Sequence, residues 1–147
     1  MRFLLLTMAL AASPALAQIK IDNAWARATA PGARIAAGYM VIHNGSAVPD
    51  RLTGVSSPSA EKAEMHVTIK EGDVFRMREV KGYEIPAHGS FELKPAGAHL
   101  MLVNIKAPLR EGDTVPLTLR FERAGEVKTE LHVGRLTGGA PEQHKMH

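Results

Sequence analysis

The stretch Gly97–Ile105, "GAHLMLVNI", decides the fold expected for this chain, because it has the sequence of a β-strand. Successive side chains of a strand point to opposite faces, so Leu100 and Leu102 share one face while His99 and Met101 share the other. We expect the leucine face to pack in a hydrophobic core. The opposite face then carries an imidazole beside a thioether, a pairing that core packing does not explain.

The rest of the chain consists of similar short segments separated by turn-forming residues. Breaks such as "PGA", "NGSAVPD", "IPAHGS" and "APLREGD" are rich in Gly, Pro, Asn and Asp. Short strands at this spacing are typical of an all-β sandwich or barrel, and no long segment has the apolar period of a helix. The predicted strands are Ile19–Arg27, Ala36–His43, Arg51–Ser56, Lys62–Lys70, Val74–Val80, Ser90–Leu93, His99–Ile105, Thr114–Glu122 and Glu126–Val133.

The N-terminal residues have the composition of an export signal. They read "MRFLLLTMALAASPALAQ", with one arginine, an apolar run, a proline and an Ala-Leu-Ala triplet. This order matches a secretory signal peptide, and the apolar run is shorter than a transmembrane helix requires. We therefore expect a signal peptide over residues 1–17 and one folded domain over residues 18–135. The mature protein is expected to be exported and not to span the membrane.

The composition excludes several classes of function. The chain of 147 residues has no cysteine and a formal net charge of +3, which is too small and dispersed to suggest a nucleic-acid partner. Without cysteine there is no disulfide, no thiol redox chemistry, and no zinc–thiolate, iron–sulfur or blue-copper site. No nucleophile elbow, phosphate-binding loop, dinucleotide fingerprint or H-E-x-x-H sequence is present. We therefore expect a binding protein and not an enzyme.

Two further predicted strands carry residues that could join His99 and Met101 in a site. In "AEMHVTIK", Met65 lies on the apolar face, so His66 faces the other way. The "EGD" turn separates this segment from "VFRMREV", which predicts a hairpin that brings His66 and Met77 into the same region. The candidate metal ligands are therefore His66, Met77, His99 and Met101.

Two imidazoles and two thioethers form a soft, neutral ligand set. Calcium and magnesium ions prefer oxygen ligands, and a thioether is a poor ligand for zinc. Cu(I) is the first-row ion best matched to thioether sulfur together with imidazole. Both imidazoles must be neutral to bind a metal, so the affinity is expected to fall below about pH 6.5. The residues leave open whether three or all four ligands bind at once.

The spacing His66-x10-Met77-x21-His99-x-Met101 resembles the H-x10-M-x21-H-x-M signature of the periplasmic copper chaperones called PCuAC. The segments "AWARATAPGARIAAGYM", "DRLTGVSSPSAEKAEMH", "IPAHGSFELKPAGAHLML" and "PLREGDTVPLTLRFERAG" also resemble that family. The resemblance covers nearly the whole predicted domain and includes all four candidate ligand positions.

This resemblance implies a cupredoxin-like Greek-key β-sandwich with an exposed Cu(I) site at those four residues. It also implies a periplasmic chaperone that delivers copper toward the assembly of cytochrome c oxidase. Subunit II of the oxidase and a Sco-type thiol protein would then be the partners. Because this chain has no cysteine, any thiol reduction of the target must come from such a partner.

Three alternatives stay open at this point. A periplasmic copper scavenging, storage or resistance protein would use the same site without a dedicated delivery target. An electron-transfer cupredoxin is disfavoured, because blue-copper sites use a cysteine thiolate. A structural β-sandwich without metal is the last alternative.

The C-terminal segment "LTGGAPEQHKMH", residues 136–147, differs from the domain in having no core pattern. We expect a flexible tail there, by its polar, Gly- and Pro-containing composition. His144, Met146 and His147 form a candidate auxiliary copper site, in which imidazoles suit Cu(II) and the thioether suits Cu(I). The alternative is a chance cluster in an unstructured end.

Overall fold

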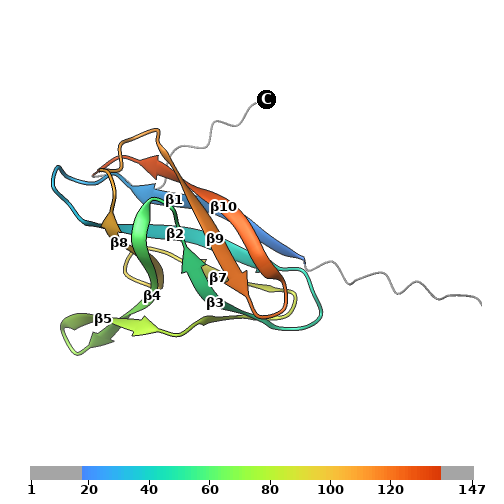
Figure 1. Cartoon of the computed structure of the whole chain (residues 1–147). Helices are drawn as coiled ribbons and strands as arrows, with labels where there is room; N and C mark the ends of the chain where they lie inside the picture. The colour runs from blue at the N-terminus through green and yellow to red at the C-terminus, as the bar shows by residue number, and fades with distance from the viewer. Residues whose placement is uncertain (1–17, 137–147) are drawn as a thin grey trace, which may run out of the picture.

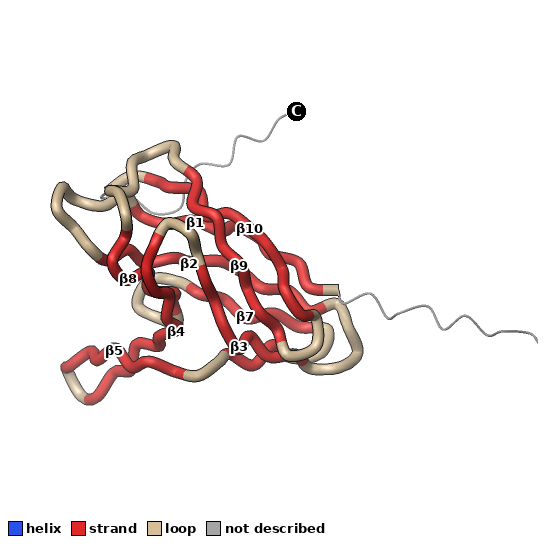
Figure 2. Tube along the Cα trace, in the orientation of Figure 1, coloured by secondary structure: helices blue, strands red, loops and turns tan. Residues whose placement is uncertain are grey.

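The computed structural model describes residues 18–136, and these form an all-β fold, as predicted. Figures 1 and 2 show strands joined by loops and turns, with no helix in the described part. No helix of those residues is therefore long and apolar enough to cross a membrane. The predicted signal peptide and the tail residues His144, Met146 and His147 lie outside the described residues.

The predicted strands are confirmed, with ends that differ by at most two residues, and one strand was missed. The missed strand is β6, which has only three residues and therefore too few positions to display an alternating pattern. The strands are β1 (Ile19–Arg27), β2 (Ile35–Asn44), β3 (Asp50–Ser56), β4 (Ala60–Glu71), β5 (Val74–Val80), β6 (Tyr83–Ile85), β7 (Gly89–Leu93), β8 (His99–Ile105), β9 (Thr114–Phe121) and β10 (Gly125–Gly134).

The ten strands form one mixed sheet that curls over itself into two layers (Figure 1). The order is β5-β4-β8-β2-β1-β10-β9-β3-β6, and β7 also pairs with β2. Strands β1 and β10 run parallel, whereas β4, β5, β8 and β2 are joined by antiparallel pairings. The insertion of β8 between β4 and β2 brings together segments that are far apart in the sequence.

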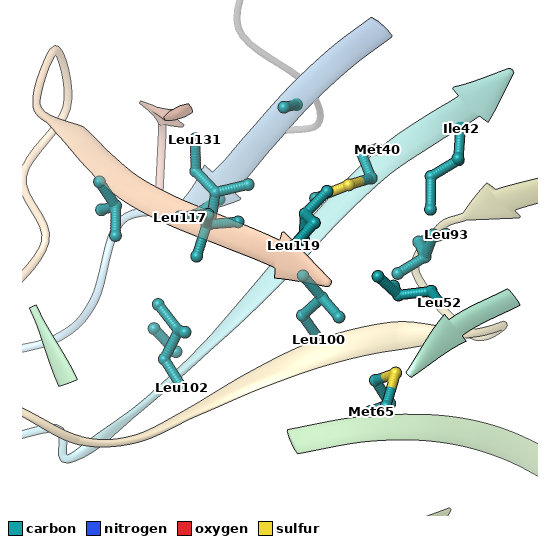
Figure 3. Packing of buried hydrophobic residues seen from close by; sticks show 14 of the residues in the cluster. Met40, Ile42, Leu52, Met65, Leu93, Leu100, Leu102, Leu117, Leu119 and Leu131 are labelled. Atoms are coloured by element: carbon teal, nitrogen blue, oxygen red, sulfur yellow. The ribbon is translucent and has the colours of Figure 1, made fainter. Parts of the chain in front are cut away.

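The hydrophobic core lies between the two layers, and Figure 3 shows leucines from both of them meeting there. Gly38 in β2 leaves room for this packing, because a Cβ atom at that position would lie 2.9 Å from Leu131 Cδ1. Burying each such side chain contributes roughly 1.5–3 kcal/mol. The fully buried side chains that meet are Leu117, Leu119 and Leu131 from one layer and Met40, Leu100 and Leu102 from the other.

Tyr83 lies on β6, which pairs with β3, and its side chain reaches the two strands that carry the histidines. Its hydroxyl lies 2.6 Å from the backbone oxygen of His66 and 2.8 Å from that of His99, so its single proton is shared between two acceptors. The side chain is almost completely buried, and this burial raises the pKa of the Tyr83 phenol to about 12. One buried hydroxyl therefore supports the backbones of β4 and β8 at the same point.

We predict that Tyr83→Phe lowers the free energy of unfolding by about 1 kcal/mol at neutral pH, because it removes a buried hydrogen bond. The phenol with a raised pKa stabilises the fold fully below about pH 10, and this contribution is lost as the pH rises toward 12. Urea denaturation between pH 8 and about pH 12 should therefore show a shallower alkaline loss in the variant. Tyr39, whose pKa burial also raises, is present in both proteins and contributes equally to their alkaline loss of stability. Equal slopes would therefore contradict the role given to the Tyr83 hydroxyl.

Candidate metal centre

The four predicted ligands lie on three neighbouring strands at one edge of the sheet. Strand β4 runs between β5 and β8, and His66 stands directly opposite His99. Met77 on β5 pairs with the residue two positions after His66, and Met101 on β8 pairs with the residue two positions before it. Paired residues of antiparallel strands share a face, and diagonal neighbours are within reach of long side chains. The register therefore brings all four side chains to one face, which is opposite to the core.

The two imidazoles form a stacked pair. Their ring centroids are 5.7 Å apart and the ring planes differ by 29°. His99 is only 6% exposed, and the side chain of His66 is 12% exposed. Both side chains point away from the core, as predicted, and both rings are largely covered.

The hydrogen bond of His66 defines which of its nitrogens carries the proton. Its Nε2 lies 2.8 Å from Glu64 Oε2, and an ionised carboxylate can only accept, so Nε2–H is the donor. Nδ1 then keeps the lone pair. It is the one buried side-chain nitrogen or oxygen within residues 18–136 that has no hydrogen-bond partner. An unpartnered buried polar atom costs about 1–3 kcal/mol, and a bound metal ion would remove that cost.

His99 is held by a similar hydrogen bond from its other ring nitrogen. Its Nδ1 lies 3.2 Å from the carbonyl oxygen of Gly97, which can only accept, so Nε2 keeps the lone pair. Histidines that bind metals usually donate their second N–H to a carboxylate or a backbone carbonyl. His66 has the carboxylate of Glu64 as this partner, and His99 has the backbone carbonyl of Gly97. Each imidazole therefore has one nitrogen fixed by a hydrogen bond and one bare nitrogen.

Glu64 is a residue of this site that the sequence analysis missed. Its Oε1 lies 2.9 Å from Lys62 Nζ, and its side chain is only 16% exposed. Hydrogen bonds from His66 and Lys62 hold the pKa of the Glu64 carboxyl below its ordinary value. The hydrogen bond between Lys62 and Glu64 also raises the pKa of Lys62. The available signal was the alternation in "KAEMH", which places Lys62, Glu64 and His66 on one strand face.

The two thioethers differ in their exposure. Met77 is 61% exposed, and it lies on β5, the edge strand of a hairpin that projects from the body at the lower left of Figure 1. Phe75 beside it on the same face is 64% exposed. Met101 is half-buried, on a strand flanked by neighbours on both sides. This face is therefore most open to solvent on the side of Met77.

The donor set restricts which ions the site can hold. Within the part of the chain that the structure describes, no three His, Asp or Glu side chains are grouped to bind a metal. The chain also contains no cysteine. The thioethers of Met77 and Met101 share a face with the two imidazoles, and a donor set of this kind suits Cu(I) better than zinc or calcium.

Comparison with solved structures places the fold among copper-protein domains. The copper-bound PCuAC domain from PmoF2 is 30% identical, with a TM-score of 0.70, and the match covers 83% of this chain and 97% of that one. The apo PCuAC domain from PmoF1 is also 30% identical, with a TM-score of 0.71 and coverages of 82% and 96%. The solution structure of CuI-DR1885 from Deinococcus radiodurans is 29% identical, with a TM-score of 0.62 and coverages of 86% and 83%. The predicted cupredoxin-like β-sandwich and the resemblance to PCuAC domains are thereby confirmed.

Sequence comparison identifies the family. Residues 19–133 match the family described as "Putative lipoprotein LpqE-like". A relative, the putative lipoprotein Lxx21020 of Leifsonia xyli subsp. xyli, is 31% identical over 128 residues, which are 86% of this chain and 75% of the relative. The chain therefore belongs to the LpqE-like family of putative lipoproteins.

Proposed function

We propose that this protein is a periplasmic Cu(I) chaperone, which binds the ion and transfers it without catalysing a reaction. Copper is its cargo, held by His66, Met77, His99 and Met101. The observation that carries the proposal is the bare, buried Nδ1 of His66 beside the stacked ring of His99. The similarity to a copper-bound PCuAC domain and to CuI-DR1885 supports copper as the ion. The N-terminal sequence and the lipoprotein relatives support export.

The uneven burial of the ligands suits transfer. The imidazoles are covered and fixed by hydrogen bonds, whereas Met77 is exposed on an edge strand. An incoming sulfur ligand can therefore replace the Met77 thioether first, while the histidines still hold the ion. All four ligands are neutral, so no thiolate has to be reprotonated when copper leaves.

The proposed destination is cytochrome c oxidase, with its subunit II and a Sco-type thiol protein as partners. The support is the resemblance of the ligand spacing to that of PCuAC chaperones, together with the lack of any cysteine in this chain. Copper storage or resistance without a delivery target is the alternative. In a strain without this gene, oxidase activity that falls and recovers with added copper would favour delivery. Copper sensitivity with normal oxidase activity would favour storage.

We predict that the described domain binds one Cu(I) tightly, and that His99→Ala or Met101→Leu weakens this binding at least about tenfold, because each change removes a ligand. The measurement is an anaerobic titration against a chromophoric Cu(I) chelator. Unchanged affinity in both variants would contradict the ligand assignment.

The matched control for this titration is Met65→Leu. Met65 is the neighbour of His66 in the sequence but points into the core, where it is 7% exposed. Exchange of Met for Leu in a core conserves volume and usually costs less than about 1.5 kcal/mol of stability. This variant should bind Cu(I) with the affinity of the unmodified protein, so a loss confined to Met101→Leu reports the position of the thioether.

We also propose an auxiliary Cu(II) site at His144, Met146 and His147. A chain that ends at Gly138 should keep its tight Cu(I) equivalent and lose Cu(II) binding, because imidazoles are good Cu(II) ligands and these lie beyond the truncation. Cu(II) stoichiometry can be measured by calorimetry on both chains. Equal stoichiometry would show that the tail does not hold the ion.

A further inference from the structure

The hydrogen-bonded chain of Lys62, Glu64 and His66 points to a role for an acidic residue outside the four-ligand set. The three side chains occupy alternate positions of β4 and therefore share the face that holds the candidate ligands. Lys62 Nζ lies 2.9 Å from Glu64 Oε1, and Glu64 Oε2 lies 2.8 Å from His66 Nε2. Each carboxylate oxygen thus has one donor, and the carboxylate cannot turn away without losing both.

We propose that Glu64 is a positioning residue, which keeps the proton of His66 on Nε2 and thereby presents Nδ1 to the metal. The inference rests on the proposed Cu(I) site and specifies how one of its ligands is prepared. A neutral imidazole can carry its proton on either nitrogen, and only the bare nitrogen binds a metal. With Nε2–H bound to Glu64, the bare nitrogen is Nδ1, which is buried and has no other partner.

The arrangement also predicts that the two histidines use different nitrogens. His99 donates from Nδ1 to the carbonyl of Gly97, so its bare nitrogen is Nε2. His66 donates from Nε2 and would bind through Nδ1. In the neutral rings both of these nitrogens already have a free lone pair, so no proton has to move from one nitrogen to the other when the ion binds. A carboxylate that accepts the second N–H also raises the donor strength of a ligating imidazole.

The first test is made on the copper-free protein, and it compares the unmodified chain with Glu64→Ala, in which the proton of His66 should no longer be held on Nε2. Nitrogen-15 NMR of the histidine rings distinguishes protonated from bare nitrogens. We expect His66 with a proton on Nε2 and His99 with a proton on Nδ1. In the Cu(I) form, which is diamagnetic, the shift on binding should fall on Nδ1 of His66. A proton on Nδ1 of His66 in the copper-free protein would overturn the inference.

The second test compares variants of two carboxylates on the same face. Glu64→Ala should lower Cu(I) affinity about 10- to 100-fold, the usual effect of removing a partner of a ligating histidine. Glu64→Gln keeps an oxygen that can accept from Nε2–H, so it should retain the ring protonation and recover part of the affinity. Glu79 stands opposite His66 on β5, and Glu79→Ala is the control for loss of one negative charge. The Cu(I) affinity of Glu79→Ala should differ from that of the unmodified protein by less than about twofold. An equally small change of affinity in Glu64→Ala would overturn the inference.

These outcomes separate the role of Glu64 from the proposed function. If the protein binds no Cu(I), the chaperone proposal fails, while the ring protonation of the copper-free protein still judges the part played by Glu64. If Cu(I) binds and His99→Ala weakens it but Glu64→Ala does not, the site stands and the positioning role is wrong. Should Glu64→Ala fail to fold, Glu64→Gln and the spectra of the unmodified protein decide.

Discussion

The pairing of Met65 with Leu100 across β4 and β8 is the constraint on which the site depends. Both side chains are buried in the core, and the next residue pair along the two strands is His66 with His99. Strand side chains alternate, so a slip of β4 by one residue would expose Met65 and push His66 into the core. The apolar side of the sheet thus determines which residues meet on its other side.

Hydrogen bonds support both the backbone and the rings of the two histidines on the candidate ligand face. The Tyr83 hydroxyl donates to the backbone carbonyl oxygens of both histidines. Glu64 accepts from Nε2 of His66, and the carbonyl oxygen of Gly97 accepts from Nδ1 of His99. Such fixed neighbours lower the reorganisation needed when an ion binds. Met77 on the projecting hairpin is exposed, and this difference from the covered histidines fits the proposed chaperone, which would have to both hold an ion and release it.

Much of the fold could be predicted from alternation and turn residues, and the exceptions have local physical causes. Strand β6 is too short to show a pattern. The bounds of β1 were predicted correctly, although a bulge between Asp22 and Trp25 shifts its register against β2 and breaks the alternation of buried side chains. Glu64 was overlooked because a charged residue on the outer face of a strand is usually solvated, and its hydrogen bond to His66 exists only when both side chains adopt the observed conformations.

By itself, the sequence predicted every strand except β6, the core face of β8, the lack of thiol chemistry and the four candidate ligands at their spacing. These follow from local periodicity and composition, which do not depend on the final fold. Only the tertiary structure decided that β4 lies between β5 and β8, that the two imidazoles are covered, and that Nδ1 of His66 is left without a partner. Pairings between distant strands and the burial of polar atoms arise from packing across the whole domain, and no short stretch of sequence contains that information.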